Sequence, residues 1–138
     1  MSYLVGSFLA LAAFELARTS GLARTRAFYP AVLAVVASLY LFFAATIGSG
    51  QLVATELLLA VPFLLALILG YRLGLWWVVA GLAAHGLLDA VHGGVVSNPG
   101  VPTWWPAFCG AYDITAAIGL GVWLTMTRAR DTGAGASV

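Results

Sequence analysis

The sequence contains no lysine and very few charged residues of any kind. Asp, Glu, Lys and Arg together make up 8% of the 138 residues, whereas 62% are hydrophobic and the mean hydropathy is +1.01. A soluble domain of average composition has about 25% charged residues, so this composition indicates an integral membrane protein with one small domain. The absence of lysine excludes Schiff-base chemistry, including the attachment of retinal to a lysine.

Cysteine and clustered basic charge are also scarce. Cys109 is the single cysteine, so an intrachain disulfide is excluded. The net charge is +1, and no run of basic residues suggests a nucleic-acid partner. The N-terminus enters an apolar stretch without a basic region or a cleavage motif, which indicates a retained first helix rather than a signal peptide.

Five apolar segments of the chain could each cross a bilayer. A transmembrane helix needs about 20 apolar residues, with a range of about 17 to 25. The segments cover residues 2–17, 28–47, 52–69, 74–96 and 107–126, and the first is the shortest. The sequence therefore predicts an all-α integral membrane bundle of five transmembrane helices. We expect a single domain, residues 1–127, followed by a mobile cytoplasmic tail, residues 128–138, that is rich in Gly, Ala and Ser.

The arginines orient these helices. All of them fall in the connectors after the first and third segments or in the tail: Arg18, Arg24, Arg26, Arg72, Arg128 and Arg130. With five spans these regions share one side of the membrane, which the positive-inside rule makes the cytoplasmic side. We therefore expect the N-terminus outside and the C-terminus inside, in the cytoplasmic (inner) membrane of a bacterium. Trp104 and Trp105, in the Pro-rich connector before the last segment, would anchor the outer interface.

Three ionisable residues lie in the middle of the fourth segment. His85, Asp89 and His92 recur at i, i+4 and i+7, so they share one face of a helix. Ionisable side chains inside a bilayer are costly and indicate a functional site by default. At 1.5 Å per residue, His92 and Asp89 lie about 6 and 10 Å from the outer end, and His85 lies about 16 Å deep, near the midplane.

Two further acidic residues reach the same layer from other helices. Glu56 lies about 6 Å, and Asp113 about 9 Å, inside the outer ends of the third and fifth segments. The layer then holds three carboxylates and two histidines with no Arg or Lys. Protonated carboxyls, charged histidines or a bound cation would each resolve this excess of acidic groups. Glu15, near the inner end of the first segment, is instead expected to pair with Arg18.

A bound metal ion is the interpretation that we favour for this layer. The two histidines of the fourth segment are about 10.5 Å apart along the axis, so they would not ligate one ion together. The spacing suits one ion with a supporting histidine, or two ions bridged by Asp89. The predicted metal ligands are His85, Asp89, His92, Asp113 and Glu56. The predicted catalytic residues are Asp89, Asp113 and Glu56. Divalent Zn, Fe, Mn or Cu fits such donors. Cys109 is a less favoured ligand, because a lone buried cysteine usually packs as a small hydrophobic residue.

The spacing HxxxDxxH at residues 85–92, followed by FCxxxD at residues 108–113, resembles a pattern of small uncharacterised bacterial multipass membrane proteins. The resemblance covers about residues 81–121 and implies a multipass membrane protein without a particular activity. Lipid hydrolases of the alkaline-ceramidase type also combine intramembrane His and Asp, although this chain lacks their pattern and offers only an analogy.

These residues predict a small membrane enzyme with a metal-dependent polar site in the outer half of the bilayer. It would act on a lipid or another apolar substrate by hydrolysis or oxidation. One alternative is metal-free acid/base isomerisation or cyclisation of an apolar substrate. Another is a proton or ion transporter, or a subunit of one, although the apolar inner half shows no path. The expected partners are the lipid bilayer and a lipid or apolar small molecule, and a homo-oligomer is left open.

Overall fold

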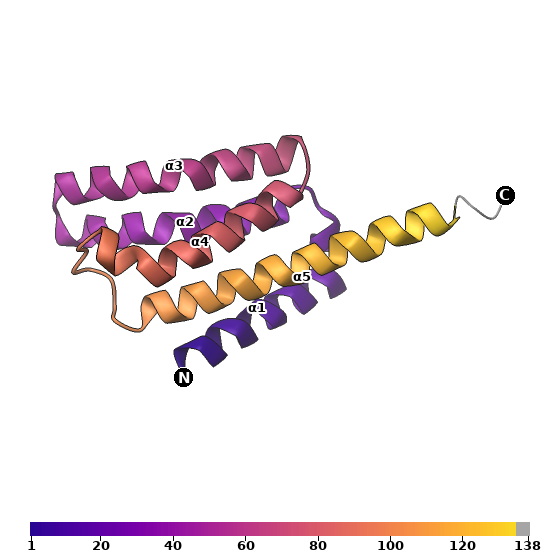
Figure 1. The fold of residues 1–138 in the computed structure, drawn as a ribbon, viewed down its shortest axis with the longest axis horizontal. Helices are drawn as coiled ribbons and strands as arrows, with labels where there is room; N and C mark the ends of the chain where they lie inside the picture. Colours follow the sequence, from indigo (N-terminus) through magenta and orange to yellow (C-terminus); the bar gives the residue numbers. More distant parts are fainter. Residues whose placement is uncertain (135–138) are drawn as a thin grey trace.

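The computed structural model describes residues 1–134, and within this range the chain is entirely helical, without β-strands (Figure 1). The helices are α1 (Ser2–Thr19), the short 3₁₀ helix η1 (Leu22–Arg24), α2 (Phe28–Ile47), α3 (Gly50–Arg72), α4 (Trp76–Val95) and α5 (Trp105–Ala134). The five α-helices lie side by side and alternate in direction along the bundle (Figure 1). The N-terminus, the α2–α3 turn and the α4–α5 loop share one end. We call the other end the arginine end, because all six arginines lie on helix segments or connectors there.

Each predicted apolar segment forms a helix, which confirms the all-α prediction for the described residues. Four of these helices are long and apolar enough to cross a membrane: α2, α3, α4 and the Trp105–Arg130 part of α5. α1 has only 18 residues and includes the charged pair Glu15 and Arg18. The structure therefore supports a membrane protein with four candidate spans, and α1 packs beside them along α5.

α5 continues beyond the predicted end of the fifth segment at residue 126. It extends to Ala134, so residues 128–134 are helical although the sequence predicted a tail from residue 128. Residues 127–132 contain no glycine or proline, and Arg and Ala have high helix propensity, so the helix propagates past the apolar region. The remainder of the predicted tail, residues 135–138, lies outside the described residues.

Glycine and serine set two of the connections between helices. Gly48 has φ 74°, a left-handed conformation that ends α2, and Ser49 then caps α3 by accepting a hydrogen bond of 3.3 Å from the backbone N–H of Leu52. Gly74, with φ 144°, separates α3 from α4. The α4–α5 loop contains two prolines, Pro99 and Pro102, which cannot continue a helix hydrogen-bond ladder. These short connections keep successive helices antiparallel.

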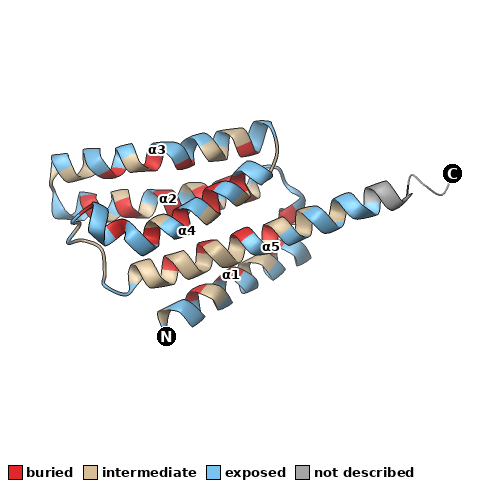
Figure 2. Ribbon diagram, viewed as in Figure 1, coloured by how far each residue is buried: buried red, intermediate tan, exposed pale blue. Residues whose placement is uncertain are grey.

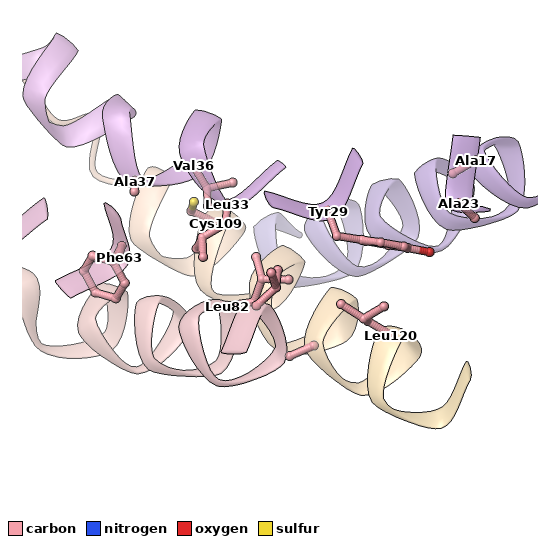
Figure 3. Packing of buried hydrophobic residues seen from close by; sticks show 12 residues of the cluster. Ala17, Ala23, Tyr29, Leu33, Val36, Ala37, Phe63, Leu82, Cys109 and Leu120 are labelled. Carbon is pink, nitrogen blue, oxygen red and sulfur yellow. The ribbon is translucent and has the colours of Figure 1, made fainter. Parts of the chain in front are cut away.

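The core divides into an apolar part and a polar part. Burial is concentrated where the helices face one another, and their outward faces are exposed (Figure 2). Leu33, Leu82 and Leu120 are fully buried and point into the space between α2, α4 and α5 (Figure 3). The buried acidic residues and histidines come from the second half of α4 and the early turns of α3 and α5, toward the α4–α5 loop. The polar core thus lies on the loop side of the apolar core.

Candidate metal centre

α4 and α5 approach each other closely at two glycines. A Cβ atom at Gly86 would lie 3.1 Å from the carbonyl oxygen of Gly110. A Cβ atom at Gly110 would lie 3.2 Å from the carbonyl oxygen of Gly86. Small residues at a helix crossing let the backbones come together, and here both partners are glycine. The crossing therefore brings the side chains that flank these glycines face to face.

Four side chains that can bind a metal flank this crossing. His85 and Asp89 come from α4, and Cys109 and Asp113 come from α5, each pair at i and i+4. One ligand atom from each residue lies within 4.8 Å of the other three, and all four residues are buried. We call these four residues the His/Asp/Cys cluster. The ligand atoms of His85 and Cys109 thus lie close together between the helices, although 24 positions separate these residues along the chain.

Two separations between ligand atoms of the cluster match those around a four-coordinate metal ion, and a third is too short. Zn–N and Zn–O bonds of about 2.0–2.2 Å and a Zn–S bond of about 2.3 Å place tetrahedral ligands about 3.3–3.8 Å apart. His85 Nδ1 lies 3.7 Å from Asp89 Oδ2, and Cys109 Sγ lies 3.8 Å from Asp113 Oδ2. His85 Nδ1 lies only 2.6 Å from Asp113 Oδ2, which is a hydrogen bond. For both atoms to bind one tetrahedral ion, the distance between His85 Nδ1 and Asp113 Oδ2 would have to increase by about 1 Å.

Two carboxylate oxygens of the cluster have unused acceptor capacity. Asp89 Oδ2 and Asp113 Oδ1 are buried and have no hydrogen-bond partner among the described residues. A buried polar atom left without a partner costs about 1–3 kcal/mol, and more when it is charged. No Arg lies in the cluster, and the chain has no Lys, so the histidine and a bound cation are the available sources of positive charge. A cation held by the cluster would give Asp89 Oδ2, which lies 3.7 Å from His85 Nδ1, the partner that it lacks.

His92 and Glu56 form a separate pair closer to the α4–α5 loop. His92 Nε2 lies 3.1 Å from each carboxylate oxygen of Glu56. Asn98, in the loop, donates a hydrogen bond of 2.8 Å to Glu56 Oε1. Neither His92 nor Glu56 belongs to the group of four ligand atoms. The predicted set of five ligands is thus divided, and the two-turn gap between the histidines explains why.

Tyr40 of α2 connects these two groups. Its hydroxyl donates a hydrogen bond of 2.6 Å to Asp89 Oδ1. Its ring stacks on the imidazole of His92, with centroids 3.7 Å apart and planes inclined by 15°. Phe63 of α3 contacts the His85 ring edge-on at 4.9 Å. Side chains from α2 and α3 therefore fix the orientation of the α4 residues. The sequence could not relate Tyr40 to Asp89, because 49 positions separate them.

Cys109, which the sequence made a less favoured ligand, belongs to the cluster. It is 2% exposed and contacts Asp113, so it lies inside the cluster rather than among purely apolar neighbours. A signal was present in the sequence: residues 85–89 read HGLLD and residues 109–113 read CGAYD. Both helices therefore carry a ligand, then glycine, then aspartate three residues later. In each case the glycine is the one at the helix crossing.

Two grooves on the surface of the bundle reach the cluster. One, of about 450 Å³, lies between α1, α2 and α5 and is lined mainly by aliphatic and aromatic side chains, with Cys109 and Tyr112 in its wall. The other, of about 590 Å³, lies between α1, α4 and α5 and has Asp89 in its wall. Ligand-binding pockets commonly have volumes of about 300–1,000 Å³. A small molecule could approach the cluster from either side.

Comparison of the chain with protein-family models, curated proteins and solved structures finds no match. The class of protein is therefore defined by its fold and site alone. It is an all-helical protein with four helices fit to cross a membrane and a buried His/Asp/Cys cluster that could hold a metal ion.

Proposed function

We propose that the chain is an integral membrane enzyme that binds a divalent transition-metal ion in the His/Asp/Cys cluster and acts on a lipid or another apolar substrate. The observation that carries the proposal is the convergence of four buried ligand atoms within 4.8 Å. A mixed set of imidazole, thiolate and carboxylate suits Zn²⁺ or Fe²⁺ better than Mn²⁺, because the thiolate is a soft ligand. The metal would supply Lewis-acid activation of water for hydrolysis, or redox chemistry for oxidation.

The location of the protein is part of this proposal. We infer that α1 crosses the bilayer alongside α5, so that five helices span the membrane with the N-terminus outside. The arginine end would then face the cytoplasm of a bacterial cell, in accordance with the positive-inside rule. The cluster, on the loop side of the apolar core, would lie in the outer half of the bilayer. Its depth would exclude bulk water and strengthen electrostatic interactions with a substrate.

The groove between α1, α2 and α5 supports an apolar substrate. Its walls are almost entirely hydrocarbon, and it opens on the side of the bundle that lipid tails would cover. Cys109 belongs both to this wall and to the cluster. A hydrocarbon chain could therefore enter sideways from the bilayer and place its reacting bond near the metal. Asp113, whose Oδ1 has no partner while its Oδ2 contacts His85 and Cys109, is the candidate general base in such a reaction.

The metal content of the purified protein tests the proposal. We expect a stoichiometric amount of one transition metal in the wild type, and loss of most of it in Asp89→Ala and Asp113→Asn. His92→Gln is the matched control, because His92 is equally buried but lies outside the group of four. Wild-type protein without stoichiometric metal, and indistinguishable from Asp89→Ala, would contradict the proposal.

A metal-free acid/base enzyme is the second candidate. The hydrogen bond of 2.6 Å between His85 and Asp113 favours it, because a carboxylate that orients a buried imidazole is a common arrangement for a general base. Such an enzyme would isomerise or cyclise an apolar substrate. Activity that survives complete metal removal would select this candidate over the metalloenzyme. A transporter has less support, because the buried core toward the arginine end is apolar in the described part of the chain.

A further inference from the structure

A second polar pocket lies at the arginine end of the bundle. It has a volume of about 260 Å³ and is formed by α1, η1 and the late turns of α5. Its lining residues are Glu15, Arg18, Thr19, Ala23, Arg24, Trp123 and Arg130. We call it the arginine pocket. It contains none of the residues of the His/Asp/Cys cluster, so its role is independent of the metal centre.

The arginine pocket carries an excess of positive charge. Three guanidinium groups line it, one from each of the three elements, together with the single carboxylate of Glu15. Glu15 pairs with Arg18 at 3.1 Å. Arg24 and Arg130 have no acidic partner among the side chains that the structure describes. Arginine presents a planar fork of N–H donors that matches the oxygens of a phosphate group. The pocket is therefore suited to a phosphate-bearing anion.

Apolar residues beside the pocket indicate that this anion is a lipid. Leu16 of α1 is 67% exposed and Leu22 of η1 is 47% exposed, next in sequence to the pocket residues. Trp123 lines the pocket, and tryptophan is enriched at the boundary between lipid headgroups and hydrocarbon. α5 leaves the bundle at this level and extends beyond the other helices (Figure 1). Guanidinium groups and exposed aliphatic side chains therefore lie on the same two elements, α1 and η1.

We propose that the arginine pocket binds the phosphate of an anionic phospholipid at the membrane surface. Arg24 and Arg130 hold the phosphate oxygens, and the acyl chains lie against Leu16 and Leu22. Basic pockets between helices on the cytoplasmic side are known to bind anionic headgroups. The bound lipid contacts α1, η1 and α5 together, so it stabilises their packing at this end of the bundle.

Lipid titration of the detergent-solubilised full chain tests this site. Phosphatidylglycerol, phosphatidylcholine and inorganic phosphate are added separately, and thermal unfolding and native mass spectra are recorded. We expect phosphatidylglycerol to raise the unfolding temperature and to stay bound, whereas the other two additions do neither. Arg24→Ala and Arg130→Ala should each weaken phosphatidylglycerol binding by about tenfold, because each removes a charge-assisted hydrogen bond. Arg72→Ala is the matched control, since it removes the same charge at the same end outside the pocket.

A variant that should bind the lipid more tightly distinguishes a role in binding from a loss of affinity caused by misfolding. Glu15→Gln removes the carboxylate from the pocket and releases Arg18, so it should bind phosphatidylglycerol more tightly than the wild type. Three results would overturn the proposal: an equal effect of phosphatidylcholine, an equal effect of inorganic phosphate, or a loss in Arg72→Ala as large as in Arg24→Ala. The second would indicate a site for free phosphate, and the third an effect of surface charge alone.

Discussion

Replacing Gly110 by alanine should weaken metal binding while the bundle stays folded. The new methyl group would lie 3.2 Å from the carbonyl oxygen of Gly86 and 3.3 Å from Asp89 Cβ. Both distances are shorter than ordinary van der Waals contacts, and neither a backbone oxygen nor a Cβ atom can rotate away. α4 and α5 would have to separate by a few tenths of an ångström. Asp89 would then move away from Cys109 and Asp113.

The magnitude of this effect follows from two opposing contributions to stability. Overpacking a helix contact costs about 1–3 kcal/mol. Alanine is favoured over glycine inside a helix by about 1 kcal/mol, which offsets part of that cost. The net loss is small beside a total stability of about 5–15 kcal/mol, so the protein should still fold. Displacing residues that position metal ligands lowers affinity by about 10–100-fold, so we expect at least about a tenfold loss.

Competition with a coloured chelator, together with thermal unfolding, measures both quantities in one preparation. Gly119→Ala is the control, because it makes the same substitution on the same helix. Its new methyl group would come no closer than 3.8 Å to the ring of Phe14, an ordinary contact. Gly119→Ala should bind metal like the wild type. If Gly110→Ala binds metal as tightly as Gly119→Ala, the glycine crossing does not set the distances between the ligands, and the reasoning fails.

Three other perturbations have defined outcomes. Tyr40→Phe removes the hydroxyl that donates to the buried Asp89 carboxylate, so the free energy of unfolding should fall by about 1–3 kcal/mol in a chemical unfolding experiment. Tyr71→Phe, at an exposed position, should change it little, and equal losses in the two variants would contradict this reasoning. Leu82→Ala should cost about 2–5 kcal/mol, because Leu82 is fully buried, whereas Leu87→Ala on the exposed face of the same helix should cost far less. Treatment with a strong chelator should lower the unfolding temperature of the wild type, since bound metal stabilises the folded state. An unchanged unfolding temperature would argue that no metal contributes to stability.

The helices could be predicted from hydropathy except at their ends. α2 has the predicted bounds, because an arginine-containing connector precedes it and Gly48 ends it. α5 passes its predicted end by eight residues, from 126 to 134, because helix propensity continues after hydropathy falls. The weak hydropathy of α1 could not decide whether it spans the membrane, since Glu15 and Arg18 lie in its last turns. Hydropathy reports contact with lipid, whereas helix ends depend on local backbone preferences.

The site could be predicted in part, since the burial of an ionisable residue within an apolar segment is visible in the sequence. His85, Asp89 and Asp113 were proposed as ligands on that basis, and the structure places them together. The grouping of the remaining residues depends on how each helix is rotated and shifted against its neighbours. That register is set by the Gly86–Gly110 contact, which puts Cys109 in the cluster and leaves His92 with Glu56. Periodicity within one helix carries no information about this register.

The absorption spectrum of the cobalt-loaded protein tests the central claim most directly. A thiolate bound to Co²⁺ gives a charge-transfer band that nitrogen and oxygen ligands alone do not give. Cys109 is the only cysteine in the chain, so such a band reports on this residue alone. We predict the band in the wild type and in His92→Gln, and its loss in Cys109→Ser. Cobalt bound by the wild type without a thiolate band would contradict a metal centre built from His85, Asp89, Cys109 and Asp113.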